Sequence, residues 1–421
     1  MGHWFDDPTL RALFPLAQSP GIRGLLTIFN TPKFYIGAHV FPEGPVLGPS
    51  TIDAFGRCEK RRAFLVTDEF NEPNCKKITR FLEMHGFTTM VWPGVLPEAP
   101  LDSIEAGGDA MKEFEPDLIM AVGGGSVIDT AKMSWVLYEK PELKSISEVN
   151  PLLILNLRKK AMLAAVPTTS GTGAECTIAA VAHDTAAHRK LPVANDELVP
   201  DVAILTPDFT MSMPPNLTAG TGLDVLAHAA DAVTAPSSHE FTEPLALKSI
   251  EMVFEWLPLA FRKGDDREAR LRMVKAASIC GIAFGQSAAH LTHAWGHALG
   301  SVFNVHHGVA VGLFIPHSLQ FNQKVTDKHL AICKALDIPA PSAEEGLSNL
   351  VEAVRKLMIS MDLPLTIKDL GISEETFEEK LPQLVELSFG DVCALIGPRP
   401  VSASQCEKIM RYAYEGKDID F

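Results

Sequence analysis

The stretch that decides the fold is 117-DLIMAVGGGSVIDTAK-132, in which an apolar run passes through three glycines into a helical pattern. Asp117–Val122 predicts a buried strand, and Ser126–Leu137 predicts a helix. Glycines at such a turn let the backbone approach a phosphate closely, and the N–H groups that begin the helix attract anions. The stretch therefore indicates a dinucleotide pyrophosphate site, and a tight turn without a ligand is the alternative.

The segments around this stretch repeat the alternation of strand and helix. Strands are expected at Lys33–Val40, Arg62–Thr67, Thr88–Trp92, Met162–Val166 and Val202–Leu205, and helices at Lys76–His85 and Ser103–Phe114. Such alternation is typical of a parallel sheet with helices on its faces. It predicts a Rossmann-like α/β domain.

From about Met213 onward, helical spacing replaces the alternation. Helices are expected at Pro244–Leu257, Arg267–Phe284, Ala343–Met361 and Glu374–Lys380, and Pro214 and Pro215 mark the junction. We therefore expect an N-terminal arm at residues 1–30, the α/β domain at residues 31–213 and an all-α domain at residues 214–421.

Charge and cysteine content exclude several classes of protein. The 421 residues carry 37 basic and 52 acidic side chains, a net charge of −15 that repels nucleic acid and anionic lipid. The seven cysteines include no C-x-x-C pair, which argues against a disulfide framework or a thiolate zinc site. No apolar run reaches the roughly 18 residues of a membrane helix. We expect a cytoplasmic protein that binds neither nucleic acid nor membrane.

Two further features of the first half suit a nucleotide. The loop 167-PTTSGTG-173 follows a strand, so its hydroxyls and glycines can line the same edge of the sheet as the glycine turn. Asp68 ends another strand, where a carboxylate can bond a ribose 2′-hydroxyl and repel a 2′-phosphate. A loop that caps its own backbone and a helix N-cap are the alternative interpretations.

The second half concentrates histidines around one carboxylate. Asp224 and His228 are spaced i, i+4 on one helix face, as are His293 and His297, and His306-His307 follows. Six of the 14 histidines fall within residues 290–317. Imidazoles and a carboxylate without thiolates suit Fe(II), Zn(II), Mn(II) or Co(II). The alternatives are packed core histidines and an aspartate that begins a helix.

Taken together, these segments resemble the iron-containing (group III) alcohol dehydrogenase family. The matching segments are 123-GGGSVIDTAK-132, 167-PTTSGTGAE-175, 222-GLDVLAHA-229 and 293-HAWGHALG-300 with His307-Gly308, and the likeness covers about residues 30–415. It implies a dehydroquinate synthase-like architecture. It also implies hydride transfer between NAD(H) and a small primary or secondary alcohol or aldehyde, in a homodimer or a larger homo-oligomer.

The resemblance assigns roles to individual residues. It implies metal ligands at Asp224, His228, His293 and His307, with Fe(II) favoured and Zn(II) as the alternative, and an active-site histidine at His297. It implies NAD contacts at Asp68, Gly124, Gly125, Ser126, Thr168, Thr169, Thr172 and Lys190. The alternative functions are a zinc-dependent glycerol dehydrogenase-like polyol dehydrogenase, a dehydroquinate synthase-like lyase and a non-catalytic nucleotide sensor with a structural metal. Few basic residues lie in residues 220–310 to bind a phosphate, which disfavours the lyase.

Overall fold

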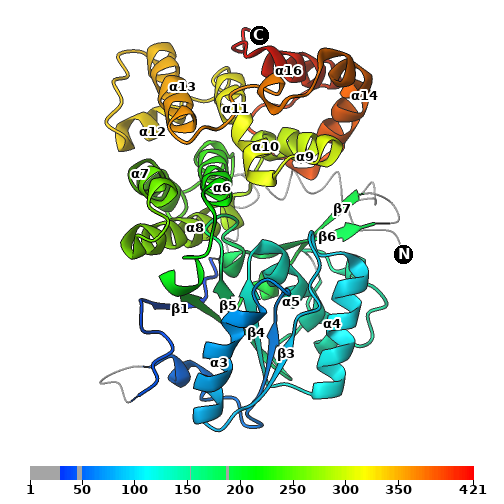
Figure 1. Cartoon of the computed structure of the whole chain (residues 1–421). Coiled ribbons are helices and arrows are strands. Elements are labelled where there is room, and N and C mark those ends of the chain that lie inside the picture. Colours follow the sequence, from blue (N-terminus) through cyan, green and yellow to red (C-terminus); the bar gives the residue numbers. More distant parts are fainter. Residues whose placement is uncertain (1–28, 45–49, 152, 186–188) are drawn as a thin grey trace. The chain divides into compact units, whose positions relative to one another are not determined.

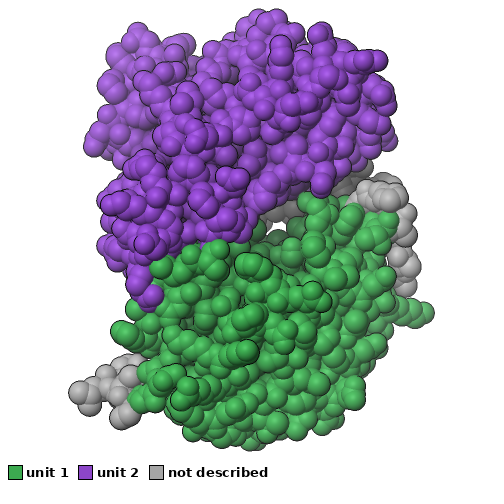
Figure 2. Space-filling model, viewed as in Figure 1, with its two compact units in different colours: residues 1–11, 29–212 green, residues 12–28, 213–421 purple. Residues whose placement is uncertain are grey.

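The computed structural model describes residues 29–44, 50–151, 153–185 and 189–421 (Figure 1). They form two compact units, unit 1 over residues 29–212 and unit 2 over residues 213–421 (Figure 2). Of the arm expected at residues 1–30, all but Phe29 and Asn30 lies outside the described residues. No helix in the described ranges is both long and apolar enough to cross a membrane.

Unit 1 is built on a six-stranded sheet in which neighbouring strands are all parallel. Its strands are β1 (Lys33–Ile36), β2 (Arg62–Val66), β3 (Thr88–Trp92), β4 (Leu118–Gly123), β5 (Met162–Pro167) and β8 (Val202–Leu205). Their order across the sheet is β1-β8-β5-β4-β2-β3. Gly123 of β4 pairs with Pro167 of β5, so the loops that follow these two strands begin side by side.

Helices cover both faces of this sheet, as the alternation of strands and helices predicts. They are α3 (Glu72–Met84), α4 (Leu101–Phe114) and α5 (Gly125–Glu139). Successive residues of a strand point to opposite faces. On β2, Ala63 and Leu65 pack with α3, whereas Phe64 and Val66 pack with α4 and α5. The predicted Rossmann-like domain is therefore confirmed.

Besides the start of α3 at Glu72 instead of Lys76, two details of unit 1 differ from the sequence prediction. The strand expected at Lys33–Val40 ends at Ile36, because Gly37 has φ +150, outside the range of an ordinary strand residue. An antiparallel hairpin of β6 (Ala179–Asp184) and β7 (Arg189–Ala194) was not predicted. Alanines fill the buried positions of β6, and alanine is a poor strand former.

Unit 2 is helical, as predicted. Its helices are α6 (Pro215–Thr234), α7 (Glu243–Arg262), α8 (Arg267–Ser287), α9 (Leu291–Phe303), α10 (His307–Leu313), α11 (Ile315–Asn322), α12 (His329–Ala335), α13 (Ala343–Ile359), α14 (Glu374–Gly390), α15 (Val392–Leu395) and α16 (Ala403–Glu415). α6 packs against α7, α8 and α10 and is buried on nearly all sides. A polar residue on α6 therefore lies in the core, where it needs a partner.

A buried lysine joins the glycine-turn helix of unit 1 to the hairpin. Lys132 on α5 is 0% exposed, and its ammonium donates to Thr177 O, Thr177 Oγ1 and Ala179 O at 2.8, 3.0 and 2.9 Å. Asp129, one turn earlier, accepts from Val181 N at 3.0 Å. Burial lowers the pKa of Lys132 to about 8, against the opposing effect of Asp129. The pair holds β6 against α5.

We predict that Lys132→Met lowers the free energy of unfolding by about 3–5 kcal/mol, because it leaves buried acceptors without a donor and Asp129 without its cation. Urea unfolding followed by circular dichroism measures the change. Lys112→Met on α4, where the lysine is exposed and pairs with the exposed Asp109, is the matched control. Equal stability of the two variants would contradict this account of Lys132.

Candidate metal centre and dinucleotide loops

The candidate metal centre begins with one turn of α6. Asp224 and His228 are only 2% and 6% exposed. His228 Nδ1 lies 2.9 Å from the backbone oxygen of Asp224, one turn back, and this contact makes Nδ1 the protonated nitrogen. The lone pair of His228 is then on Nε2, the nitrogen available to a cation.

Imidazoles from three helices surround the carboxylate of Asp224. Its Oδ1 atom lies 3.2 Å from His228 Nδ1, 3.7 Å from His293 Nε2 and 3.3 Å from His307 Nε2. Asp224, His293 and His307 form a group whose ligand atoms all lie within 4.8 Å of one another. His228 is outside that group of three, but its ring centroid lies 4.0 Å from that of His293. The structure thus brings the four predicted ligands together.

The pKa values of these residues favour binding of a cation beside Asp224. Burial raises the pKa of Asp224, but the surrounding imidazoles outweigh burial and hold it well below its ordinary value. Burial lowers the pKa of His228. Burial also acts to lower the pKa of His293, yet the nearby carboxylates of Asp224 and Asp231 raise it to about 9. A buried carboxylate therefore faces one imidazole that binds a proton tightly and another that stays neutral.

The hydrogen bonds support the same interpretation. In the described part of the chain, neither Asp224 Oδ1 nor His293 Nε2 has a hydrogen-bond partner, although both atoms are buried. Buried polar atoms without a partner are rare and need an explanation, such as an ion that is not seen. Three imidazoles and one carboxylate fit a divalent transition metal.

The structure separates the two neighbouring histidines. His307 begins α10 and points at Asp224, whereas His306 is exposed and precedes the helix. Gly308 explains how α10 comes so close to α6, because an added Cβ would lie 1.9 Å from the backbone oxygen of Gly220. Only glycine permits this approach.

His297 lies beside the predicted ligands. Its ring stacks on that of His307 at 5.3 Å, and its Nδ1 lies 2.9 Å from Asp391 Oδ2. Asp391 also accepts from the backbone of Cys393 at 2.8 Å. The ligand atoms of His297, Asp391 and Cys393 form a second close group.

Sequence reasoning missed three residues of this region. Asp231 is bonded to His293, Asp391 is bonded to His297, and the ring of Phe284 stacks on His228 at 3.9 Å. Only Asp231 carried a usable signal in the sequence, because it follows Asp224 by seven residues on an apolar helix and so lies on the same face.

The two predicted dinucleotide loops of unit 1 pack against each other. Thr168 N donates to Gly123 O at 3.0 Å. An added Cβ on Gly124 would lie 3.2 Å from Thr169 Cγ2, and one on Gly125 would lie 2.8 Å from Thr172 Cγ2. Glycine therefore lets the threonine loop pack directly on the start of α5, where Gly124, Gly125 and Ser126 remain partly exposed. This arrangement suits a phosphate at a helix N-terminus.

The other predicted cofactor residues lie nearby in unit 1. Asp68 Oδ1 accepts from Asn71 N at 2.7 Å and from Asn71 Nδ2 at 3.0 Å, so the carboxylate braces the turn before α3. It remains partly exposed. Lys190 on β7 pairs in register with His183 of β6, and its charge acts on Asp129.

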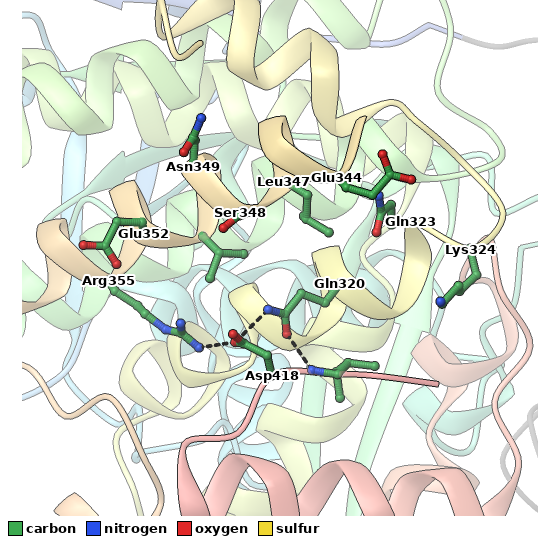
Figure 3. Close-up of a pocket in the computed structure, with 12 residues that line it drawn as sticks. Gln320, Gln323, Lys324, Glu344, Leu347, Ser348, Asn349, Glu352, Arg355 and Asp418 are labelled. Carbon is green, nitrogen blue, oxygen red and sulfur yellow. Dashed lines mark hydrogen bonds and ion pairs between the residues drawn. The ribbon is translucent and has the colours of Figure 1, made fainter. Parts of the chain in front are cut away.

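A separate polar pocket of unit 2 contains none of the predicted site residues. It has a volume of about 430 Å³ and lies between α11, α13 and the C-terminal segment (Figure 3). Asp418 accepts from Gln320 at 2.7 Å and from Arg355 at 2.6 Å, and Ile419 N donates to Gln320 at 3.0 Å. These groups satisfy one another and fasten the C-terminal segment.

Comparisons with known proteins cover both units. A family model described as iron-containing alcohol dehydrogenase matches residues 45–207. A second model, the C-terminal part of the Fe-containing alcohol dehydrogenase family, matches residues 218–414.

Individual relatives agree with the family models. An NADPH-dependent butanol dehydrogenase of Clostridium saccharobutylicum is 35% identical over 347 residues, which are 82% of this chain and 89% of the relative. A bifunctional aldehyde-alcohol dehydrogenase of Escherichia coli is 32% identical over 85% of this chain, which spans 43% of that longer protein. The structure of an iron-containing alcohol dehydrogenase from Thermococcus thioreducens matches with a TM-score of 0.81 and 27% identity, over 93% of this chain and 100% of that one.

We predict that Gly308→Ala destabilises the protein by about 3 kcal/mol and weakens binding of divalent cations, because the added methyl pushes α10 and His307 away from Asp224. Thermal unfolding and equilibrium binding of Co(II) measure the two effects. Gly390→Ala at the end of α14 is the control, since no atom of the described residues lies within 4 Å of its added methyl. If both variants bind Co(II) like the wild type, close approach of α10 is not what positions His307.

Proposed function

The chain belongs to the iron-containing alcohol dehydrogenase family, and on that premise we propose a metal-dependent enzyme that moves a hydride between a nicotinamide dinucleotide and a small alcohol or aldehyde. The observation that supports this most is the buried carboxylate of Asp224 with three imidazoles around one oxygen. Family membership disfavours the alternative of a non-catalytic sensor. We also expect a homodimer or a larger homo-oligomer.

We propose that Asp224, His228, His293 and His307 hold one divalent cation. The donor set supports both Fe(II), which the family description favours, and Zn(II), which accepts the same ligands. A cation bound there acts as a Lewis acid that polarises the substrate oxygen. His228 is neutral and Asp224 is ionised, the states in which each binds a cation, whereas His293, whose pKa is raised to about 9, must release a proton when the cation binds.

We propose that His297 transfers the proton of the reaction. The carboxylate of Asp391 is ionised, since its pKa, although raised by burial, is lowered overall by His297 and by backbone and side-chain hydrogen bonds. An ionised carboxylate only accepts hydrogen bonds, so His297 Nδ1 carries a hydrogen and Nε2 carries the lone pair. We propose that Nε2 takes the hydroxyl proton during alcohol oxidation and returns it during carbonyl reduction.

For the cofactor, we propose that the glycine turn and the threonine loop hold the dinucleotide pyrophosphate. The proposed contacts are Asp68, Gly124, Gly125, Ser126, Thr168, Thr169, Thr172 and Lys190. The partial exposure of Gly124 and Gly125 at the start of α5 supports the phosphate site. Asp68 would bond the ribose of NAD and repel the 2′-phosphate of NADP. Since the Clostridium relative is described as NADPH-dependent, the preference between NAD and NADP needs its own test.

We predict that His293→Ala abolishes metal content and turnover together. Loss of a ligand should weaken metal binding by more than the roughly 10- to 100-fold that loss of an outer hydrogen-bond partner costs. Elemental analysis of anaerobically purified protein measures the metal, and also separates iron from zinc. NADH and NADPH absorbance with a panel of alcohols and aldehydes measures turnover.

His306→Ala is the matched control, because His306 is exposed and is not among the described histidines whose ring nitrogens lie within 4.0 Å of the Asp224 carboxylate. It should keep both metal and activity. Undiminished turnover in metal-free wild-type protein would refute the proposed mechanism.

We predict that Asp68→Gly raises the ratio of kcat/KM with NADP to kcat/KM with NAD by about tenfold or more, because it removes a carboxylate that repels the 2′-phosphate. Asp68→Asn should act in the same direction while its amide oxygen still accepts from Asn71. The adjacent exposed residue supplies the control, Glu69→Gln, which should leave the ratio unchanged. An unchanged ratio in both Asp68 variants would remove Asp68 from cofactor selection.

A further inference from the structure

A second buried carboxylate contacts one of the proposed metal ligands. Asp231 lies on α6 seven residues after Asp224 and is 1% exposed. It accepts from the backbone N–H of His290 at 2.8 Å and from Thr292 Oγ1 at 2.6 Å. His293 Nδ1 lies 2.9 Å from Asp231 Oδ2. All of these contacts are buried, so solvent does not compete with them.

Asp231 acts on His293 as a fixed hydrogen-bond acceptor. Both of its oxygens already accept hydrogen bonds, Oδ2 from the backbone N–H of His290 and Oδ1 from the hydroxyl of Thr292. A carboxylate whose two oxygens both accept has no hydrogen to donate to Nδ1. His293 must therefore carry its hydrogen on Nδ1.

His290 does not share this role, although its ring is also close. Its Nδ1 lies 3.1 Å from Asp231 Oδ1, but this nitrogen accepts a hydrogen bond from Leu291 N at 2.8 Å and so carries the lone pair. Its Nε2 lies 2.9 Å from Thr234 Oγ1, whose own hydrogen is donated to a backbone carbonyl one turn earlier. His290 is a neutral imidazole, which agrees with the lowering of its pKa by burial. Among the described imidazoles beside Asp231, His293 is therefore the donor.

We propose that Asp231 is a positioning residue, which fixes His293 as the Nδ1–H tautomer and turns the lone pair of Nε2 towards Asp224 and the cation. The inference rests on the proposed function, because it assumes that His293 is a ligand. The position of Nε2, 3.7 Å from Asp224 Oδ1 and without a hydrogen-bond partner among the described residues, is what such an arrangement requires. Outer carboxylates that bond a ligand imidazole commonly orient it and raise its basicity.

The chain itself contains a matched pair for testing this role. Asp391 and His297 repeat the arrangement of Asp231 and His293, with the same 2.9 Å between carboxylate and Nδ1. His297, however, is not a proposed ligand. The same substitution at the two aspartates therefore separates an effect on metal binding from a general effect of removing a carboxylate beside an imidazole.

The test measures the affinity of the metal-free protein for Co(II) alone, by competition with a chromophoric chelator and by the visible spectrum of the bound ion. Asp231→Asn should bind Co(II) about 10- to 100-fold more weakly, because an amide can also donate to Nδ1 and so permits the tautomer whose Nε2 cannot bind metal. Asp391→Asn should bind Co(II) like the wild type. Asp231→Ser, with room for a water molecule, replaces Asp231→Asn if that variant does not fold, and should weaken binding similarly.

A second control separates positioning from packing. Thr292→Val removes the 2.6 Å bond to the same carboxylate without touching His293, so it should lower thermal stability and leave Co(II) affinity unchanged. The inference is overturned if Asp231→Asn binds Co(II) as tightly as the wild type, or if Thr292→Val or Asp391→Asn loses as much affinity as Asp231→Asn. Wild-type protein that binds no Co(II) would instead overturn the proposed function on which the inference rests.

Discussion

The structure of unit 2 depends on one constraint, the burial of ionised carboxylates in an apolar helix bundle. Asp224 and Asp231 lie on α6 and are 2% and 1% exposed. An isolated charge in such surroundings costs several kcal/mol unless a cation or several hydrogen bonds compensate it. The groups that face these carboxylates are imidazoles, a hydroxyl and a backbone N–H, and the imidazoles supply positive charge only by binding a proton or a metal. The helices α9 and α10, which bring those imidazoles to α6, are arranged around this requirement.

Unit 1 also contains a buried charge, but there the side chains and backbone of the same unit compensate it. Lys132 is as deeply buried, but its three ammonium hydrogens have three acceptors, and Asp129 supplies the nearby negative charge. That group is complete without a ligand, which is typical of a structural role. Around Asp224, by contrast, two buried atoms of the described chain have no hydrogen-bond partner. The cluster around Lys132 and the cluster around Asp224 are both buried and charged. They differ in whether every buried polar atom has a hydrogen-bond partner, and this difference distinguishes them better than burial or residue type does.

The sequence predicts those features of the structure that arise from residues close together in the chain, and it misses those that depend on residues far apart. The alternation of strands and helices and the i, i+4 spacing of Asp224 and His228 are local patterns. They predicted the fold class and the placement of Asp224 and His228 on one face of a helix, but not the role of Asp231 on the same helix. The hairpin of β6 and β7 was missed because its buried positions hold alanines, and the hairpin depends on Lys132 from another element. Asp391, almost a hundred residues after His297, gave no local signal, since its role arises only when α9 and α15 pack together.

Glycines allow the helices that carry the proposed ligands to approach one another closely. Glycine inside a helix costs about 1 kcal/mol relative to alanine, so its presence there needs a reason. An added Cβ on Gly296 of α9 would lie 2.6 Å from Val311 Cα of α10, and one on Gly308 of α10 would lie 1.9 Å from the oxygen of Gly220. The backbones of α6, α9 and α10 are therefore in near contact, and the short side chain of Asp224 can reach imidazoles from both other helices. Because the same close packing forms the core and the proposed metal site, a cation that binds only the folded state would also stabilise the bundle.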